Sequence, residues 1–252
     1  MSKPLILISN DDGINAKGLH ELIDLMRPYG NLFVSVPEDG KSGMSQSLTL
    51  FKPLTLTKVT ESAGLIIYKC NGTPIDAVKL AFNKFIPRKP DFFVAGINHG
   101  SNASISAFYS GTVGTAIEAY FHSIPAVAFS LLSHDPDADF SIARKYIPEI
   151  FEMIMQMPYK QELCLNVNFP NIPEHSGKGI KICRQTRGFW KENFVEKKQN
   201  GTTTFFMQGN FYNEEPNAID TDEWALKNNF VSVVPLSKDL TNYTILNKLN
   251  KQ

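Results

Sequence analysis

The feature that most constrains the fold is an alternation of short apolar runs with helical patterns over the first 130 residues. The strand patterns are PLILIS (4–9), LFVSV (32–36), IIYKC (66–70), FFVAGI (92–97) and AVAFSL (126–131). Helical patterns follow the first, third and fourth of these: LHELIDLMR (19–27), DAVKLAFNKF (76–85) and VGTAIEAYFHS (113–123). Such alternation is typical of βαβ units. The strands show almost no polar alternation, so we expect an α/β fold whose parallel sheet is covered by helices on both faces.

Length, composition and charge limit the number of domains and the kinds of partner that we expect. The chain has 252 residues, 42% of them hydrophobic, so we expect one main domain over 1–252, with an appendage. Lys plus Arg and Asp plus Glu are 25 each. Without a basic excess we expect no nucleic-acid polymer as partner.

Cysteine usage and hydropathy indicate the compartment. Cys70, Cys164 and Cys183 are widely spaced and stand among strand-like residues, which is typical of buried thiols in a reducing compartment. We find no signal-like N-terminus and no run of about 18 apolar residues. We therefore expect a soluble, cytoplasmic protein without a membrane partner.

After a helical pattern at 143–157 the chain becomes strand-rich, with LCLNVNFP, KICRQT, TTTFFMQG and VSVVPL. The segment 193–208 has Asn200-Gly201 between two extended polar runs, which predicts a hairpin with a type I′ turn. Its strands are too polar to form a core alone. We interpret the region near 190–210 as a protruding β-hairpin arm that packs on a partner subunit; a surface hairpin on a monomer is the alternative.

Two adjacent acids, Asp11 and Asp12, follow the first predicted strand directly. In an open parallel sheet, ligands bind outside the carboxyl ends of the strands. Neighbouring carboxylates raise each other's pKa unless a cation or a helix N-terminus offsets their charge. The N-terminus of the helix expected near Gly18 would supply part of the compensating positive charge, and a divalent metal would supply the rest. In the alternative, one acid caps that helix and the other points to water.

Further oxygen donors follow neighbouring strands. Ser42, with Ser45 and Ser47, lies in the loop after the second strand, and Asn98 and Asn102 follow the strand at 92–97. Carboxylate, hydroxyl and amide oxygens without a histidine or cysteine cluster favour Mg²⁺ or Mn²⁺ over zinc.

The stretch YSGTVGTAIEAYF has small residues, Ser110, Gly111 and Gly114, at a helix entrance. Its backbone amides suit a phosphate, although Ser110 as a plain N-cap explains the pattern equally well. Thr73, Pro74 and Asp76 in NGTPIDAVKLAF satisfy the capping rules without a ligand, and we interpret them as structural.

Single residues near these loops allow two interpretations each. His99 either orients a leaving group or bonds a loop carbonyl, and we interpret the other four histidines, His134 among them, as structural or solvent-facing. Phe108 and Tyr109 either stack on a base or fill the core, which we favour.

Taken together, the motifs resemble the SurE family of survival-protein nucleotidases. The matching segments, in the family's order, are NDDGI (10–14), SGMSQSLTL (42–50), GTPIDAV (72–78), PDFFVAGINHGSN (90–102), YSGTVGTAIEA (109–119), LNVNFP (165–170) and VSVVPLSKDLT (231–241). The loop before Ser42 departs from the family at Gly40, where Asn is expected, and TRGFW at 186–190 is a looser match.

The resemblance implies a Rossmann-like fold with a C-terminal exchanged segment for oligomer contacts, in a homodimer or homotetramer. It also implies a metal-dependent phosphomonoesterase acting on nucleoside 5′-monophosphates, often 3′-monophosphates, and in some members short polyphosphate. The implied ligands of one Mg²⁺ or Mn²⁺ per subunit are Asp11, Asp12, Ser42 and Asn98. The implied phosphate-binding positions are Asn10, Asn102, Ser110, Gly111 and Thr112.

In the reaction we expect, a metal polarises a phosphoryl oxygen and holds the attacking water. Asp11 and Asp12 anchor the ion, and one of them accepts the proton of the water. Asn102 and Ser110, with amides at Gly111 and Thr112, stabilise charge on the equatorial oxygens.

Three other classes fit less well. A phosphatase with an aspartyl nucleophile, as in the haloacid dehalogenase superfamily, has one residue between its two acids and a downstream lysine, whereas these acids are adjacent. A zinc deacetylase would bring histidines, and none flanks residues 10–13. A signalling receiver would carry an acceptor Asp after a strand in the 40s or 50s, and this chain is about twice the usual domain length.

Overall fold

The computed structural model describes residues 3–199 and 201–251. Its strands are β1 (Leu5–Ser9), β2 (Asn31–Pro37), β3 (Leu56–Ser62), β4 (Leu65–Cys70), β5 (Phe92–His99), β6 (Ala126–Leu131), β7 (Cys164–Phe169), β8 (Ile180–Ile182), β9 (Gly188–Gln199), β10 (Thr202–Asn213) and β11 (Val231–Pro235). The α-helices are α1 (Lys17–Met26), α2 (Pro74–Leu80), α3 (Gly111–Phe121), α4 (Ser141–Gln156), α5 (Asp222–Lys227) and α6 (Tyr243–Leu249). Short helices are η1 (Ala81–Phe85), η2 (Ser104–Phe108), η3 (Lys160–Glu162) and η4 (Glu174–Ser176).

Nine strands form one sheet in the order β3-β4-β2-β1-β5-β6-β7-β11-β8. The six strands from β4 to β7 are mutually parallel, which confirms the expected α/β fold with a parallel-sheet core. From β1 the chain passes to β2 and β4 on one side, then returns to β5 on the other. This reversal opens a crevice at the carboxyl ends of β1 and β5, where open α/β sheets bind ligands.

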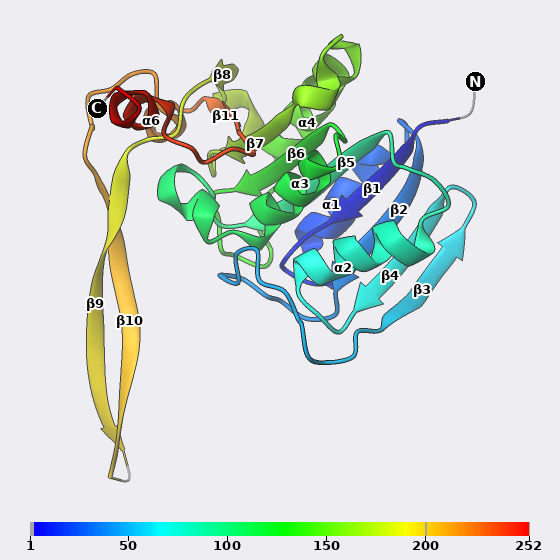
Figure 1. Ribbon diagram of the computed structural model, residues 1–252, viewed down its shortest axis with the longest axis horizontal. Coiled ribbons are helices and arrows are strands. Elements are labelled where there is room, and N and C mark those ends of the chain that lie inside the picture. The colour runs from blue at the N-terminus through cyan, green and yellow to red at the C-terminus, as the bar shows by residue number, and fades with distance from the viewer. Residues whose placement is uncertain (1–2, 200, 252) are drawn as a thin grey trace.

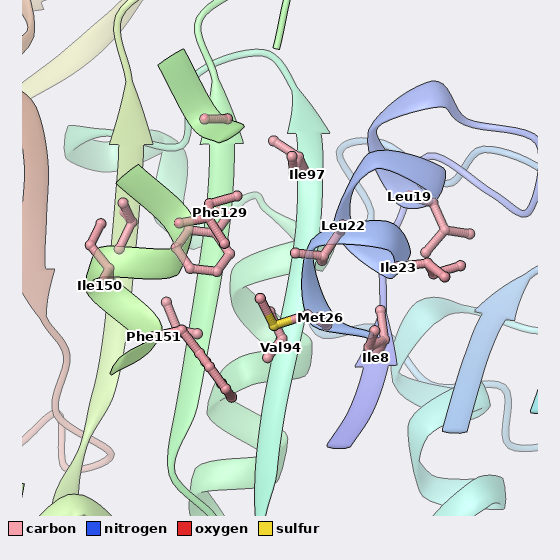
Figure 2. Close-up of a cluster of buried hydrophobic side chains, with 14 of the residues drawn as sticks. Ile8, Leu19, Leu22, Ile23, Met26, Val94, Ile97, Phe129, Ile150 and Phe151 are labelled. Carbon is pink, nitrogen blue, oxygen red and sulfur yellow. The ribbon is translucent and has the colours of Figure 1, made fainter. Parts of the chain in front are cut away.

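One face of the sheet is covered by α1 and α4. Leu22 and Met26 of α1 and Ile150 and Phe151 of α4 are buried in one cluster with Ile8 of β1 (Figure 2). The full sets of buried residues in α1 and in α4 recur three and four positions apart, so burial of an apolar stripe explains why both segments are helical. Gly18 allows close packing, because a Cβ there would lie 2.0 Å from the carbonyl oxygen of Ile97.

The other face is covered by α2 and α3, which lie in front of the sheet in Figure 1. Val78 of α2 and Val113 of α3 share a buried cluster with Leu7 of β1. At the start of α2, Thr73 accepts from the backbone of Asp76 and the Asp76 side chain accepts from the backbone of Thr73. This reciprocal capping box confirms the structural interpretation of the GTPIDAV motif.

Three strands differ from the simple parallel pattern. β3 and β11 run antiparallel to their neighbours, β4 and β7, and β8 runs parallel to β11. β3 is almost wholly exposed and its sequence is polar, so hydrophobic patterning gave no signal for it. The short helices α5 and α6 were equally hidden, since six or seven residues are too few for a clear period.

The predicted hairpin is present and longer than 190–210. β9 and β10 are antiparallel strands of 12 residues each, and the arm projects well away from the sheet (Figure 1). Gly201 has φ +76°, as a tight turn requires; Asn200, the other residue of the expected type I′ turn, lies outside the described residues.

The cysteines match the prediction made for them. All three cysteines are buried and free, as predicted. Within residues 3–199 and 201–251, no helix is long and apolar enough to cross a bilayer.

Candidate active site

A cavity of about 230 Å³ opens at the rim where β1, β5 and α3 meet. It is lined by Asp11, Ser42, Gly43, Asn98, His99, Gly100, Ser101, Asn102, Ser106, Tyr109, Ser110, His134 and Trp190. Five of the nine predicted metal-binding and phosphate-binding residues, Asp11, Ser42, Asn98, Asn102 and Ser110, therefore line one space. The other four, Asn10, Asp12, Gly111 and Thr112, do not line it; Gly111 and Thr112 bond to Asp11.

Asp11 sits at the N-terminus of α3. The backbone N–H of Gly111 donates to Asp11 Oδ2 at 3.1 Å, and the Thr112 hydroxyl donates to Asp11 Oδ1. Gly111 makes this approach possible, because a Cβ there would lie 2.7 Å from the Asp11 Cβ. Neither Asp11 nor Asp12 accepts a hydrogen bond from the start of α1 among the described residues, so the alternative in which one acid caps that helix is wrong. The positive end of α3 lies against Asp11 and helps to offset its charge. A contribution from α1 stays a prediction.

The acid pair is electrostatically strained. Burial raises the pKa of Asp11 to about 6, with Asp12 adding to the rise and the bonds from Thr112 and Gly111 opposing it. Burial also raises the pKa of Asp12, opposed by the N–H of His99. Among the described residues that line the cavity there is no lysine or arginine. The charge of the pair is therefore left for a ligand to compensate.

Asp12 joins the ends of β1 and β5. The backbone N–H of His99 donates to Asp12 Oδ2 at 2.9 Å. The His99 ring lies with Nδ1 3.0 Å from the carbonyl oxygen of Asp135. Of the two interpretations of His99, the contact with a loop carbonyl is the one present.

The loop that carries Ser42 is held against the acids. The N–H of Lys41 donates to the carbonyl oxygen of Asp11 at 2.6 Å. Gly13 has φ +91°, and a Cβ there would lie 3.0 Å from the backbone of Asp39, so only glycine allows the two loops to meet in this way. Ser42 itself is exposed and lines the cavity, whereas Ser45 donates to the carbonyl oxygen of Phe108 instead.

A β-bulge directs Asn98. The register of β5 against β6 shifts between Ala95 and Asn98. Gly96 in the bulge has φ +117°, and a Cβ there would lie 2.3 Å from the carbonyl oxygen of Phe129. Bulges re-aim side chains beside active sites. Asn98 Nδ2 donates to the carbonyl oxygen of Gly100 at 2.8 Å, which fixes the amide, and no bond between described residues uses its Oδ1.

A buried amide network holds Asn102. Its backbone N–H donates to Asn168 Oδ1 at 2.9 Å, its Nδ2 donates to Ser130 Oγ at 2.8 Å, and its carbonyl accepts from Asn166 Nδ2. Asn168 Nδ2 in turn donates to Asn166 Oδ1. Asn166 and Asn168 alternate along β7, so both point to one face. The two asparagines of LNVNFP therefore serve to hold Asn102 in place. From the sequence alone, LNVNFP is only a family motif and assigns these asparagines no role.

Two further polar residues complete the rim. Ser110 is the N-cap of α3, because its Oγ accepts from the N–H of Val113 at 3.0 Å. It also lines the cavity, and its hydroxyl hydrogen is still free to donate, so the two interpretations of Ser110 are compatible. Asn10 is buried; its Nδ2 donates to the carbonyl oxygen of Gly13, and its Oδ1 has no partner among the described residues.

The sequence interpretation missed His134 and Trp190 as cavity residues. The His134 ring lies against Gly100, where a Cβ would be 2.3 Å from its Cε1. His134 follows β6, so the rule that strand ends share one edge was the available signal. Trp190 comes from the arm, and nothing in the sequence places the arm beside the rim. Phe108 and Tyr109 are 57% and 52% exposed, so the core interpretation of these two was wrong.

The donor set fits a hard divalent cation. No group of three or more His, Cys, Asp or Glu able to hold a metal occurs within the described ranges. The cavity instead combines the Asp11 carboxylate with the Ser42 hydroxyl and the Asn98 amide. Such oxygen sets, completed by water, suit Mg²⁺ or Mn²⁺. The absence of lysine and arginine from the described lining is consistent with this fit.

Comparisons with known proteins agree with this architecture. The profile of the family described as "Survival protein SurE" matches residues 6–192. A protein named 5′-nucleotidase SurE from Flavobacterium psychrophilum is 44% identical over 252 residues, covering 99% of this chain and 98% of its own. That of Cytophaga hutchinsonii is 45% identical over 253 residues, covering 100% and 97%.

A solved structure is similar throughout its length. The crystal structure of the SurE protein from Aquifex aeolicus superposes with a TM-score of 0.83 at 31% identity, covering 98% of this chain and 99% of the other. Sequence and structure thus agree over nearly the whole chain, and the protein belongs to the SurE family.

Proposed function

We propose that this protein is a metal-dependent 5′-nucleotidase, which hydrolyses nucleoside 5′-monophosphates to nucleoside and phosphate. The observation that carries the proposal is the buried Asp11 carboxylate, fixed at the N-terminus of α3 in a cavity whose lining, within the described residues, contains no lysine or arginine. The relatives named 5′-nucleotidase SurE support the substrate class. Nucleoside 3′-monophosphates and short polyphosphate are the further substrates we propose to test.

One Mg²⁺ or Mn²⁺ ion would be held by Asp11, Asp12, Ser42 and Asn98. When bound, the ion would supply Lewis acidity toward a phosphoryl oxygen. The contacts from α3 and from His99 fix the two carboxylates before any ligand arrives. Such preorganisation is what a charge-stabilising site requires.

On the phosphate side, we propose that Ser110 and Asn102 donate to the phosphoryl oxygens, with Asn10 supporting the turn. Ser110 keeps a free hydroxyl hydrogen, and the Asn102 amide retains a second N–H beyond its bond to Ser130. The N–H of Gly111 and the hydroxyl of Thr112 bond to Asp11 here. We therefore propose that Gly111 and Thr112 act by positioning Asp11. One acid of the pair would accept the proton of the attacking water.

We also propose a homodimer or homotetramer whose contacts use the arm and the C-terminal segment. The arm exposes Phe194, Phe205 and Phe206, and α6 exposes Leu246 and Leu249. Exposed apolar residues in such numbers are typical of surfaces that another chain covers. A single domain over 1–252 in the cytoplasm is part of the same proposal; three free, buried thiols are compatible with a reducing compartment.

The test is release of phosphate from a panel of nucleotides with Mg²⁺ or Mn²⁺. Asp12→Asn removes ligand charge with little change of volume, so we expect loss of metal-dependent turnover in a folded protein. Asp39→Asn is the matched control, because Asp39 is exposed and does not line the cavity. Full activity in EDTA, or turnover by Asp12→Asn equal to that of Asp39→Asn, would contradict the proposal.

A further inference from the structure

A second cavity, of about 290 Å³, adjoins the first. It is lined by Tyr109, Trp190, Glu192, Met207, Gln208 and Gly209. Tyr109 and Trp190 line both cavities, so the two spaces share a wall. We propose that this second cavity holds the nucleobase of the substrate while the phosphate lies in the first, with Trp190 as the main stacking residue. The inference rests on the proposed function and adds to it a base-binding role for the arm.

The register of the arm creates the space. Glu192 pairs with Gly209 across the two strands, next to the pair Trp190 and Phe211. Side chains of alternate residues share one face of a strand, so Trp190 and Glu192 project together. On the opposite strand, Gly209 contributes no side chain between Phe211 and Met207. The apolar row of β10 is therefore interrupted opposite Glu192, which leaves room for a flat ring.

The root of the arm is fixed to the loop that carries Tyr109. The fully buried Asp222 accepts from the N–H of Thr186, at the root, at 2.9 Å and from the N–H of Ser104, in η2, at 2.8 Å. The Ser104 hydroxyl donates to the carbonyl oxygen of Thr186 at 2.8 Å, and Gln185 Nε2 donates to the carbonyl oxygen of Ser104. The two walls of the cavity are thus positioned relative to each other before a ligand binds.

The side chains offer the chemistry that a base requires. The Trp190 ring is 37% exposed and is held edge-on to Phe211, at a centroid distance of 6.3 Å and an interplanar angle of 70°. The Tyr109 ring is 52% exposed. Base-aromatic stacking of this kind is sequence-tolerant. The Glu192 carboxylate only accepts hydrogen bonds when ionised, so it favours a base with an exocyclic amino group.

The first experiment compares two phosphate esters that differ only in the base. We expect Trp190→Ala to lower the ratio of kcat/KM for adenosine 5′-monophosphate to kcat/KM for ribose 5-phosphate about tenfold, mainly through the KM of the nucleotide. Trp190→Phe keeps a stacking ring and should restore most of the ratio. Tyr212→Ala is the matched control, because Tyr212 is an exposed ring on the other face of β10 and lines neither cavity. A ratio unchanged by Trp190→Ala overturns the inference.

The second experiment needs no turnover. The chain has two tryptophans, Trp190 and Trp224, so in a Trp224→Phe variant all tryptophan emission comes from Trp190. With Mg²⁺ present, adenosine 5′-monophosphate should quench or shift that emission, and ribose 5-phosphate should not. Emission that stays unchanged at saturating nucleotide overturns the base site.

The two proposals fail in different ways. If the wild type hydrolyses both esters equally well and Trp190→Ala changes neither, the phosphatase proposal survives and the base site does not. If neither ester is hydrolysed with any metal, the proposed function fails, and the fluorescence titration still decides whether the cavity binds a base.

Glu192 gives a finer prediction within the same site. Adenine and hypoxanthine differ in carrying an amino group or a carbonyl oxygen at one ring position. We expect the wild type to prefer adenosine over inosine 5′-monophosphate severalfold, and Glu192→Gln, which can also donate, to reduce that preference. If the wild type and Glu192→Gln prefer adenosine over inosine 5′-monophosphate to the same extent, Glu192 does not contact the base.

Discussion

The sheet buries its apolar residues, whereas the arm exposes them. Along β1, β6 and β7 every residue is buried, whereas β9 and β10 are exposed along nearly their whole length. The apolar side chains of the sheet are buried within one chain, because α1 to α4 cover its two faces. No described helix covers the arm in this way, so its stability and its role depend on contacts outside its own strands. The candidate site lies where these two regions meet.

Removal of a core ring should show the largest effect. Phe129 of β6 is fully buried in the main cluster. We expect Phe129→Ala to lower the free energy of unfolding by about 3–5 kcal/mol, because it leaves a cavity among close-packed neighbours. Chemical denaturation measures this, and a loss below about 1 kcal/mol would mean that this part of the sheet is less tightly packed than the structure shows.

The junction between the regions should respond to pH. Burial, and secondarily Asp222, raises the pKa of Glu223 in α5 to about 7 from 4.5. The folded state therefore favours the protonated acid: the stability it contributes is complete below pH 4.5 and is lost as pH rises through 7. The full effect corresponds to about 3 kcal/mol.

Glu223→Gln tests this, because it removes the titration with little change of shape. We expect unfolding free energy at pH 8 to rise relative to the wild type and the two proteins to converge near pH 5. Parallel stability curves between pH 5 and 8 would show that Glu223 titrates normally.

A methyl group at the rim should affect activity rather than stability. In Gly111→Ala the new Cβ would lie 2.7 Å from the Cβ of Asp11, so the carboxylate must move. We expect kcat/KM for nucleotides to fall roughly a hundredfold, equivalent to about 2.7 kcal/mol. Gly40→Ala is the control, since its Cβ would approach nothing closer than 3.5 Å. Equal activities of the two variants would argue against the role of α3 in holding Asp11.

The smallest effect should come from the arm. Phe206 is 50% exposed, so Phe206→Ala should change the unfolding free energy of an isolated subunit by less than about 0.5 kcal/mol. Light scattering should instead show a smaller assembly, or one that dissociates at higher concentration. A large loss of stability at unchanged size would place Phe206 in a core of its own subunit.

Much of the sheet was predictable from sequence because buried parallel strands are continuous apolar runs, as PLILIS and AVAFSL are. The rule that ligands gather at the strand ends then brought Asp11, Ser42 and Asn98 to one rim. The polar edge strand β3 could not be predicted in this way, because an exposed strand needs no apolar pattern.

Contacts between distant segments could not be predicted. Asp11 follows β1, and its nearest helix along the chain is α1, yet it binds the start of α3, 100 residues away. Trp190 reaches the rim because hydrogen bonds of Asp222 and Ser104 fix the root of the arm to η2. Such choices depend on the packed structure rather than on any local pattern.

Calorimetric titration of Mn²⁺ into the nucleotide-free protein tests the central claim most directly. If the oxygen-lined rim at the ends of β1 and β5 is a cation site, the wild type and Asp39→Asn should each bind one ion per subunit, and Asp11→Asn and Asp12→Asn should bind at least tenfold more weakly. Equal Mn²⁺ affinity in all four proteins, or no binding by the wild type, would contradict the account.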